Sequence, residues 1–433
     1  MYWLYSRGLG LLALLWLPVF LVRKVWRAGH PLALAERLGW VPFRPGPPRL
    51  WLHAVSVGEV VAAVPLVHAL RARWPGVEIV VSTVTATGAA VARTRLPGVG
   101  GVFTCPLDLP GSVRRALGRI EPRALVVLET ELWPNLFRAL ARAGRPIAVV
   151  NARISDRSFR RYRRVRAVFR RVLENVTLFA AQSPEDGRRL RDLGAPPARV
   201  VVTGNLKMDL RPADGLDGAE WRRRLGLGQP LLWVAGSTHR GEEEAVLAAF
   251  QAARAGQPGL GLVLAPRHPE RVDEVEALAR AGGVRVGRRS RAGEPGQGQP
   301  DVLLVDTIGE LAALYGLADL VFVGGSLAPI GGHNVIEPAV HGKAIVFGPH
   351  MSNFRSAAAL LLDAGAAVQV GDGLELSQAV SRLLADGAER RRLGDAARAA
   401  VLAHQGALDR TMAALDAVLA PALGPGPAPR PAR

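Results

Sequence analysis

Short apolar runs alternate with longer amphipathic stretches along most of the chain after Pro31. Each apolar run has the length of one strand, and each amphipathic stretch has the spacing of a helix with one buried face. This alternation predicts a parallel sheet with helices on both faces. The predicted strands of the first half are Arg49 to Val55, Val77 to Ser82, Ala124 to Leu128, Ile147 to Val150, Leu178 to Ala181 and Val200 to Thr203.

A second set of apolar runs begins after Gly204 and is about equal in size. It predicts strands at Leu231 to Ala235, Leu260 to Leu264, Val302 to Val305, Leu320 to Val323 and Ala344 to Phe347. The chain therefore reads as two doubly wound α/β domains, residues 29–206 and 207–420, with a linker near Pro212 to Gly218. Such domains bind ligands at the carboxyl ends of their strands, so we expect a cleft between them.

Both ends of the chain differ from this pattern. The run from Gly8 to Val22 is apolar, and Arg23, Lys24 and Arg27 follow it directly. No small-x-small cleavage motif follows, so residues 1–28 are predicted to be an uncleaved membrane anchor with the later residues in the cytoplasm. Whether the anchor spans the bilayer or lies in one leaflet is open. The tail, residues 421–433, is rich in Pro, Gly and Ala and is predicted to be disordered.

The charge of the chain indicates the kind of partner that it binds. The chain has 55 basic and 37 acidic residues among its 433, a net charge of +18. Such an excess favours an anionic partner, which can be nucleic acid, an anionic membrane face or a phosphorylated substrate. Cys105 is the one cysteine, which excludes an internal disulfide, and no Cys/His cluster has zinc spacing.

The most informative run is F-V-G-G-S-L-A-P-I-G-G-H-N-V-I-E, residues 322–337. Its two glycine pairs would let backbone N–H groups approach a ligand, and the helix start after them suits phosphate. Glu337 can accept hydrogen bonds from ribose hydroxyls. The run therefore predicts a nucleotide site, and the alternative is an ordinary glycine-rich turn between a strand and a helix.

Three carboxylates and a lysine follow strands of the first half. Glu59 closes H-A-V-S-V-G-E, where it can act as a general base or simply favour a helix start. Glu129 and Glu131 of L-E-T-E-L-W-P-N face the same side and can bind a metal, stabilise charge or contact sugar hydroxyls. Lys207, in G-N-L-K-M-D, is one of three lysines beside 52 arginines and can neutralise a leaving group.

A basic stretch runs from Asn151 to Arg171 and holds nine arginines interleaved with Phe159, Tyr162 and Phe169. It can bind nucleic acid, bind the phosphates of an acidic glycolipid, or be a solvated basic helix. The predicted membrane anchor favours the lipid ligand.

Further polar loops follow strands of the second half. They hold Ser237 and Thr238, Arg267 and His268, and Gly309 and Glu310. Together with the glycine-rich run they are expected to converge on one nucleotide.

These motifs together resemble the family of 3-deoxy-D-manno-octulosonic acid (Kdo) transferases. The matching runs are H-A-V-S-V-G-E, T-E-L-W-P-N, N-A-R-I-S-D-R-S-F-R-R-Y, G-N-L-K-M-D, A-G-S-T-H-R-G-E-E-E, L-A-P-R-H-P-E-R, and F-V-G-G-S-L-A-P-I-G-G-H-N-V-I-E-P through G-P-H-M-S-N-F. They lie in the family's order between residues 53 and 354.

The resemblance implies a GT-B glycosyltransferase with two Rossmann-like domains, the acceptor on the first and the donor CMP-Kdo on the second. The acceptor would be a tetraacyl, bisphosphorylated lipid A precursor at the cytoplasmic side of the inner membrane, and inversion without a bound metal or cofactor is implied. The resemblance gives Glu59 as the base, and Glu131 and Lys207 as residues that stabilise the transition state. The CMP-binding positions that it implies are Arg267, His268, Ile308, Gly309, Glu310, Asn334, Val335, Ile336 and Glu337. Possible acceptor-binding residues are Ser56, Gly58, Arg157, Arg160 and Arg161.

Two rival hypotheses remain at this stage. One is a GT-B transferase that uses a UDP-sugar and another lipid acceptor. The other is a membrane-tethered nucleic-acid-binding protein, which leaves Glu59, Glu131 and the glycine turns unexplained.

Overall fold

The computed structural model describes residues 2–3, 5–11, 34–209, 218–292 and 299–424. Residues 12–28 of the predicted anchor lie outside this part of the chain, as does most of the predicted tail. The described chain forms two compact units. Unit 1 contains residues 1–209 and 405–433, and unit 2 contains residues 210–404.

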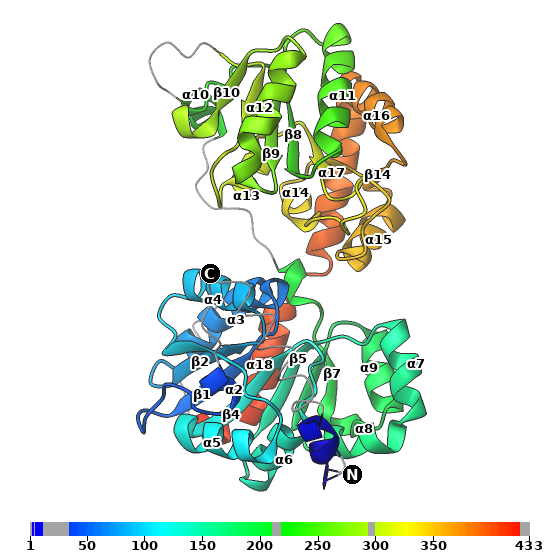
Figure 1. Cartoon of the computed structure of the whole chain (residues 1–433). Helices are drawn as coiled ribbons and strands as arrows, with labels where there is room; N and C mark the ends of the chain where they lie inside the picture. The colour runs from blue at the N-terminus through cyan, green and yellow to red at the C-terminus, as the bar shows by residue number, and fades with distance from the viewer. Residues whose placement is uncertain (1, 4, 12–33, 210–217, 293–298, 425–433) are drawn as a thin grey trace. The chain divides into compact units, whose positions relative to one another are not determined.

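Unit 1 is built on a seven-stranded parallel sheet with the strand order β3-β2-β1-β4-β5-β6-β7 (Figure 1). Every residue of β1 is buried, as expected for a strand covered on both faces. The strands are β1 (Arg49–His53), β2 (Glu78–Thr83), β3 (Gly101–Thr104), β4 (Pro122–Leu128), β5 (Ile147–Ala152), β6 (Leu178–Ala181) and β7 (Val200–Val202).

Helices cover both faces of this sheet and bury two separate apolar clusters. Trp51, Phe103 and Phe137 belong to one cluster, while Leu66 and Leu415 belong to the other. The covering helices are α3 (Val57–Arg73), α4 (Ala86–Arg95), α5 (Pro110–Ile120), α6 (Pro134–Arg142), α7 (Asp156–Arg164), α8 (Arg166–Leu173), α9 (Pro184–Asp192) and α18 (Ala407–Leu423).

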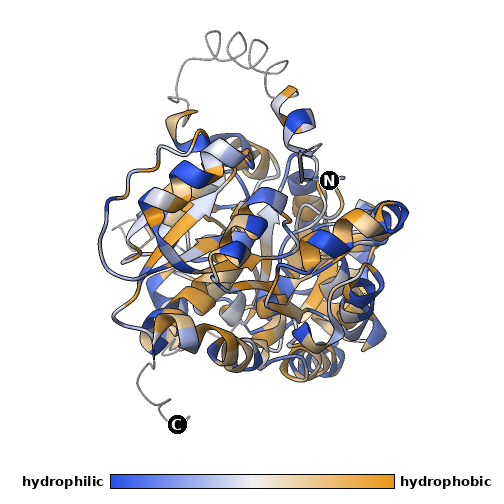
Figure 2. Ribbon diagram, turned by 90° about the horizontal axis from the view of Figure 1, so that it is seen from below, coloured by the Kyte–Doolittle hydropathy of each residue, from blue (hydrophilic) through white to orange (hydrophobic). Residues whose placement is uncertain are grey.

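Unit 2 repeats the design with the strand order β10-β11-β9-β8-β12-β13-β14, again all parallel. Across the chain as a whole, Figure 2 shows hydrophobic residues on many strands and hydrophilic residues on the outer parts of many helices. The strands are β8 (Leu231–Thr238), β9 (Leu260–Pro266), β10 (Val286–Arg288), β11 (Val302–Leu304), β12 (Leu320–Val323), β13 (Ala344–Phe347) and β14 (Ala367–Gln369). The main helices are α10 (Gly218–Arg224), α11 (Glu242–Gly256), α12 (Val272–Ala281), α13 (Leu311–Leu317), α14 (Ile336–Val340), α15 (Arg355–Asp363), α16 (Gly373–Ala385) and α17 (Gly387–Leu402).

Each sheet has one point where the direction of winding reverses. In unit 1 this point lies between β1 and β4, and in unit 2 it lies between β8 and β12. The loops that leave neighbouring strands diverge there and open a crevice at the carboxyl ends, where doubly wound sheets bind ligands. The loops at these two points carry Glu59, Glu129 and Glu131 in unit 1, and the glycine-rich run in unit 2.

The last helix, α18, belongs to unit 1, although the sequence boundaries assign it to the second domain. Leu415 and Leu419 are fully buried in a unit 1 cluster, and Arg73 of α3 forms an ion pair with Asp416 at 2.8 Å. The prediction of a disordered tail from residue 421 is wrong for its first residues, because α18 continues through Pro421 to Leu423. The apolar face of the helix outweighs the composition, since Leu423 still packs on the same cluster.

Within the described residues, no helix is both long enough and apolar enough to cross a bilayer.

Candidate active site

Glu59 lies in the first turn of α3, directly behind the carboxyl end of β1. Its carboxylate accepts hydrogen bonds from the backbone N–H of Val55 at 2.7 Å and from the Ser56 hydroxyl at 3.0 Å. The side chain is buried, and burial raises the pKa of Glu59 to about 7, helped by the negative charges of Glu129 and Glu131. The local geometry thus provides a fixed carboxyl group that changes its protonation state near neutral pH.

Glu129 and Glu131 approach the same place from the end of β4. Glu129 has a left-handed backbone with φ at 57°, which is uncommon for a residue with a side chain. Its carboxylate forms an ion pair with the Lys207 ammonium at 2.9 Å. Burial and the charge of Glu129 together raise the pKa of Glu131. The structure therefore brings Glu59, Glu131 and Lys207 into one cluster, in which Glu129 is the link between Lys207 and the carboxylates.

Asn151 positions the turn that carries Lys207. This residue also has a left-handed backbone, with φ at 54°, and is fully buried at the end of β5. Its side-chain oxygen accepts the backbone N–H of Leu206 at 3.0 Å, and Asn205 accepts the N–H of Lys207 at 3.0 Å. Left-handed residues such as Glu129 and Asn151 each cost on the order of 1–2 kcal/mol, and they often cluster at functional sites.

The predicted acceptor residues divide into two groups. Ser56 contacts Glu59 directly, and a Cβ at Gly58 would lie 4.0 Å from the Ser56 hydroxyl oxygen. Arg157, Arg160 and Arg161 are exposed on α7, with no ion pair among the described residues.

The aromatic residues of the arginine-rich stretch are packed and do not form an open stacking surface. Tyr162 and Phe169 stack at 4.1 Å between ring centroids, and Phe159 and Tyr162 pack on a core cluster. Their role in the fold is to attach the basic helices α7 and α8 to unit 1, which weakens the case for base stacking.

Glu242 organises the switch point of unit 2. Its carboxylate is 1% exposed and accepts five backbone N–H groups, which belong to His239, Gly325, Ser326, Leu327 and Ala328 at 2.7–3.1 Å. The expectation that the first glycine pair offers its N–H groups to a ligand is therefore wrong, because an internal carboxylate takes those of residues 325–328. Gly324 has a packing role instead, since a Cβ there would lie 2.5 Å from the Ser237 carbonyl oxygen.

Three histidines and an arginine gather above this loop. The Nε2 atoms of His239 and His333 lie 2.9 Å apart, and the ring of His268 meets His239 edge-on at 5.6 Å. Burial lowers the pKa of His333 to about 4, with the neighbouring His239, Arg267 and His268 acting in the same direction. Burial also lowers the pKa of His239. Arg267 and His268 are exposed after β9, where they can meet an anion.

The remaining predicted donor residues lie on loops of the same sheet edge. Gly309 has φ at 95°, and Ile308 is 83% exposed before it. The carboxylate of Glu310 is held by Arg289 at 2.7 Å. This leaves the Ile308 side chain and the backbone of the loop available to a ligand.

The segment from Asn334 to Glu337 begins α14. Asn334 donates to the Glu337 carboxylate at 3.1 Å and accepts the Ile336 N–H at 3.0 Å. Val335 and Ile336 are buried in the core, so only their backbone groups can touch a ligand. Glu337 is the carboxylate of this segment, and the Asn334 amide fixes its position at the start of α14.

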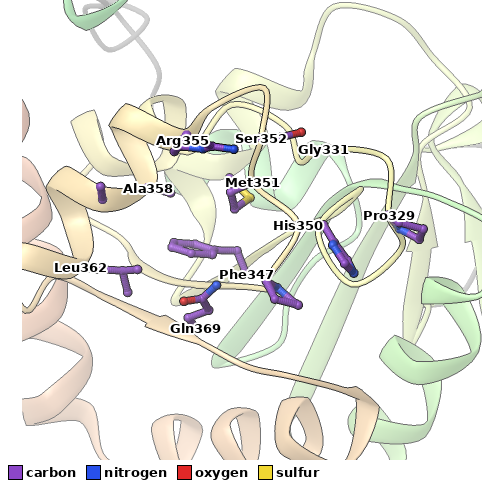
Figure 3. A pocket seen from close by; sticks show the side chains of 12 residues that line it. Pro329, Gly331, Phe347, His350, Met351, Ser352, Arg355, Ala358, Leu362 and Gln369 are labelled. Carbon is purple, nitrogen blue, oxygen red and sulfur yellow. The ribbon is translucent and has the colours of Figure 1, made fainter. Parts of the chain in front are cut away.

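A cavity of about 400 Å³ lies farther along the same edge, at the ends of β13 and β14. Figure 3 shows Arg355 and Ser352 beside Gly331, with Met351 below them and Phe347, Gln369 and Leu362 across the cavity. The G-P-H-M-S-N-F motif supplies several of these residues. The cavity therefore combines an apolar floor with an exposed guanidinium.

Comparison with known proteins decides the family. A protein from Haemophilus influenzae named 3-deoxy-D-manno-octulosonic acid transferase is 37% identical over 383 residues, which cover 88% of this chain and 90% of that protein. A protein of the same name from Bordetella pertussis is 39% identical over 427 residues, covering 94% and 96%. The family model described as 3-Deoxy-D-manno-octulosonic-acid transferase (kdotransferase) matches residues 33–210.

The chain belongs to the 3-deoxy-D-manno-octulosonic acid transferase family. The resemblance seen in the ordered motifs is thereby confirmed, and the chain is a glycosyltransferase by family.

Solved structures add the fold of this transferase. UDP-GlcNAc 2-epimerase from Neisseria meningitidis matches with a TM-score of 0.57 at 11% identity, over 85% of this chain and 99% of that one. A glycosyltransferase from Rickettsia africae matches with a TM-score of 0.54 at 11% identity, over 88% and 100%. The GT-B-like fold with two parallel seven-stranded sheets is thus confirmed, while the cleft and the anchor stay predictions.

Several residues of this transferase site were not singled out from the sequence. They are Asn151, Glu242 and His239, and the contact between His239 and His333 was not predicted either. Glu242 belongs to the motif A-G-S-T-H-R-G-E-E-E. Runs of acidic residues are common at helix starts, so the sequence gave no reason to choose one of these three glutamates. Among the described residues, no group of three or more His, Cys, Asp or Glu side chains has the arrangement of a metal site.

Proposed function

We propose that this protein transfers Kdo from CMP-Kdo to a hydroxyl of a phosphorylated, tetraacyl lipid A precursor, with inversion and without a bound metal. The observation that carries the mechanism is the position of the Glu59 carboxyl group, which is held by Val55 and Ser56 and whose pKa is raised by burial to about 7. Family membership supplies the substrate class.

In the proposed step, the ionised Glu59 accepts the proton of the acceptor hydroxyl while that oxygen attacks the anomeric carbon of Kdo. The bond from this carbon to the phosphate oxygen breaks, and CMP leaves with the electron pair. Direct attack from the opposite side inverts the anomeric centre. Glu131 would stabilise positive charge that develops on the sugar, and Lys207 would offset the negative charge of the donor.

Unit 2 would hold the donor and unit 1 the acceptor. Arg267, His268 and Glu337 would bind the nucleotide together with the backbone at residues 308–310 and 334–336. The exposed arginines of α7 would bind the phosphates of the lipid, since guanidinium groups pair with phosphate bidentately.

The proposed location is the inner membrane, with both units on the cytoplasmic side. The apolar run from Gly8 to Val22 and the basic residues behind it support this location. The described start of the chain is attached to unit 1, because the Tyr2 hydroxyl donates to the Arg171 carbonyl at 3.0 Å. A membrane-bound amino terminus would therefore lie close to the basic helix α8.

The test uses purified protein, a tetraacyl lipid A precursor and CMP-Kdo supplied by a generating system, with products weighed by mass spectrometry. We expect a mass increase of one or more Kdo residues, and the spectrum also counts how many are added. Parallel reactions with UDP-sugars test the rival donor. Transfer from a UDP-sugar but not from CMP-Kdo contradicts the proposal.

The acid limb of the pH profile should report Glu59. Because the base must be ionised, we expect kcat/KM to fall about tenfold for each pH unit below about 7. Glu131→Gln removes a negative neighbour, which should lower the Glu59 pKa and move this limb to lower pH. The measurement is a kcat/KM profile from pH 5 to pH 9 for both proteins. A wild-type kcat/KM that stays level from pH 7 down to pH 5 contradicts the assignment of Glu59.

Replacement of Arg157, Arg160 and Arg161 by Gln should raise the KM for the lipid acceptor by roughly tenfold or more, because each lost contact is charge-assisted. The KM for CMP-Kdo should stay within about twofold. Steady-state kinetics with each substrate varied in turn measures both constants. Arg93→Gln with Arg95→Gln, which removes two charges at exposed sites of α4, is the control. A larger change in the donor KM than in the acceptor KM contradicts this role.

A further inference from the structure

The loop that follows β12 cannot bind a phosphate through the backbone N–H groups of its first residues. The backbone N–H groups of residues 325–328 all donate to Glu242, and the Gly332 N–H donates to the Gly325 carbonyl. A phosphate beside residues 325–328 must therefore be bound by other groups, and side chains are among them. The side chains that meet there are His239, His268, His333 and Arg267.

The His239–His333 pair can take up one proton without losing the hydrogen bond between the two rings. At 2.9 Å between their Nε2 atoms, one ring donates the shared hydrogen and the other accepts it. The nearly parallel rings, 3° apart, hold this contact in place. One added proton keeps the shared hydrogen bond and gives the pair a single positive charge. A second proton would place two N–H groups face to face and break the contact.

The surroundings of the pair favour the neutral form of both rings. Burial is the main cause of the lowered pKa values of both rings, and Arg267 and His268 after β9 add repulsion. Glu242 and Glu243 of α11 oppose this effect at His239. Glu243 is paired with Arg271 at 3.0 Å, and Glu242 is saturated with backbone N–H groups. An anion above the rings would supply the counter-charge that these carboxylates do not.

We propose that the His239–His333 pair, together with Arg267 and His268, is the subsite for the phosphodiester of the nucleotide donor, and that the pair takes up one proton when this anion binds. The inference rests on the proposed function, because it takes the donor to be a nucleotide-activated sugar. By linkage, the anion binds more tightly as the pH falls, and proton binding strengthens to the same degree when the anion is present.

The probe is cytidine 5′-(methyl phosphate), whose single negative charge does not titrate between pH 5.5 and pH 8. Calorimetry on the full chain at pH 6.5, in two buffers of different ionisation enthalpy, should show net proton uptake. The dissociation constant should rise by up to about tenfold per pH unit above pH 6. Cytidine, which lacks the phosphate, should bind without proton uptake.

His333→Gln should weaken binding of the diester by roughly tenfold or more, abolish proton uptake and leave cytidine affinity within about twofold. His404→Gln, at an exposed site of unit 2, should match the wild type. Diester binding that is independent of pH and releases or takes up no proton overturns the inference. Equal losses of diester and cytidine affinity in His333→Gln overturn it as well, because they indicate a structural role.

The transfer assay separates this inference from the function itself. If the wild type transfers Kdo but binds the diester without proton uptake, the proposed function stands and the inference about the histidine pair is wrong. A wild type that transfers no Kdo and binds neither cytidine nor the diester overturns both.

Discussion

Glu59→Gln is expected to lower kcat for Kdo transfer by roughly a thousandfold or more while leaving CMP affinity within a few-fold. The amide keeps the size of the side chain and can still accept one hydrogen bond from Val55 or Ser56, but it cannot accept the proton of the acceptor hydroxyl. General bases typically contribute about 10²–10⁴ in rate, which sets the size of the expected loss.

The measurement is single-turnover transfer with saturating donor, alongside calorimetric binding of CMP. Glu174→Gln, which removes an exposed carboxylate at the end of α8, serves as the control and should transfer Kdo at the normal rate. Near-normal turnover in Glu59→Gln would refute the base assignment. A parallel loss of CMP affinity would instead indicate damage to the fold.

Glu242→Gln should reduce both the free energy of unfolding and donor affinity. One carboxylate oxygen accepts three N–H groups and the other accepts two, so the amide must turn an NH₂ group toward N–H donors on one side. Each buried N–H left without an acceptor costs about 1–3 kcal/mol. We expect a loss of about 3 kcal/mol or more in stability and a CMP affinity weakened by roughly tenfold or more.

Urea unfolding and CMP calorimetry measure the two effects. Glu244→Gln lies on the exposed side of the same helix and should change neither. If Glu242→Gln unfolds at the wild-type urea concentration and binds CMP normally, the loop after β12 does not depend on this carboxylate, and the role assigned to it is wrong.

The sequence predicted the inner strands of the two sheets better than the edge strands. The inner strands of both sheets were predicted closely, because a strand buried on both faces is a continuous apolar run. Three short strands at or near the sheet edges, β3, β10 and β14, were missed. They have three or four residues and are only partly buried, so their sequences carry little hydrophobic signal.

The sequence singled out the candidate catalytic residues but not the residues that hold them in place. Glu59, Glu131 and Lys207 stand in distinctive motifs, and the structure brings these three together in unit 1. The ion pair of Lys207 with Glu129 joins residues 78 positions apart, and the bond from Leu206 to Asn151 spans 55. No local sequence pattern predicts such contacts, because they depend on which strands lie side by side in the sheet.

The amino-acid sequence by itself determined the family, the parallel α/β architecture and the presence of a carboxylate at the end of the first strand, because these depend on local periodicity and on motifs within short segments. Tertiary structure alone decided the use of the glycine-rich loop. The sequence predicted that backbone N–H groups of this loop are available to a ligand. In the fold, the buried carboxylate of Glu242 accepts hydrogen bonds from four of these N–H groups. Tertiary structure also paired His239 with His333, since the crossing from β8 to β12 joins loops 94 residues apart. Packing between distant segments sets which polar groups remain available to a ligand, and a linear pattern contains no record of it.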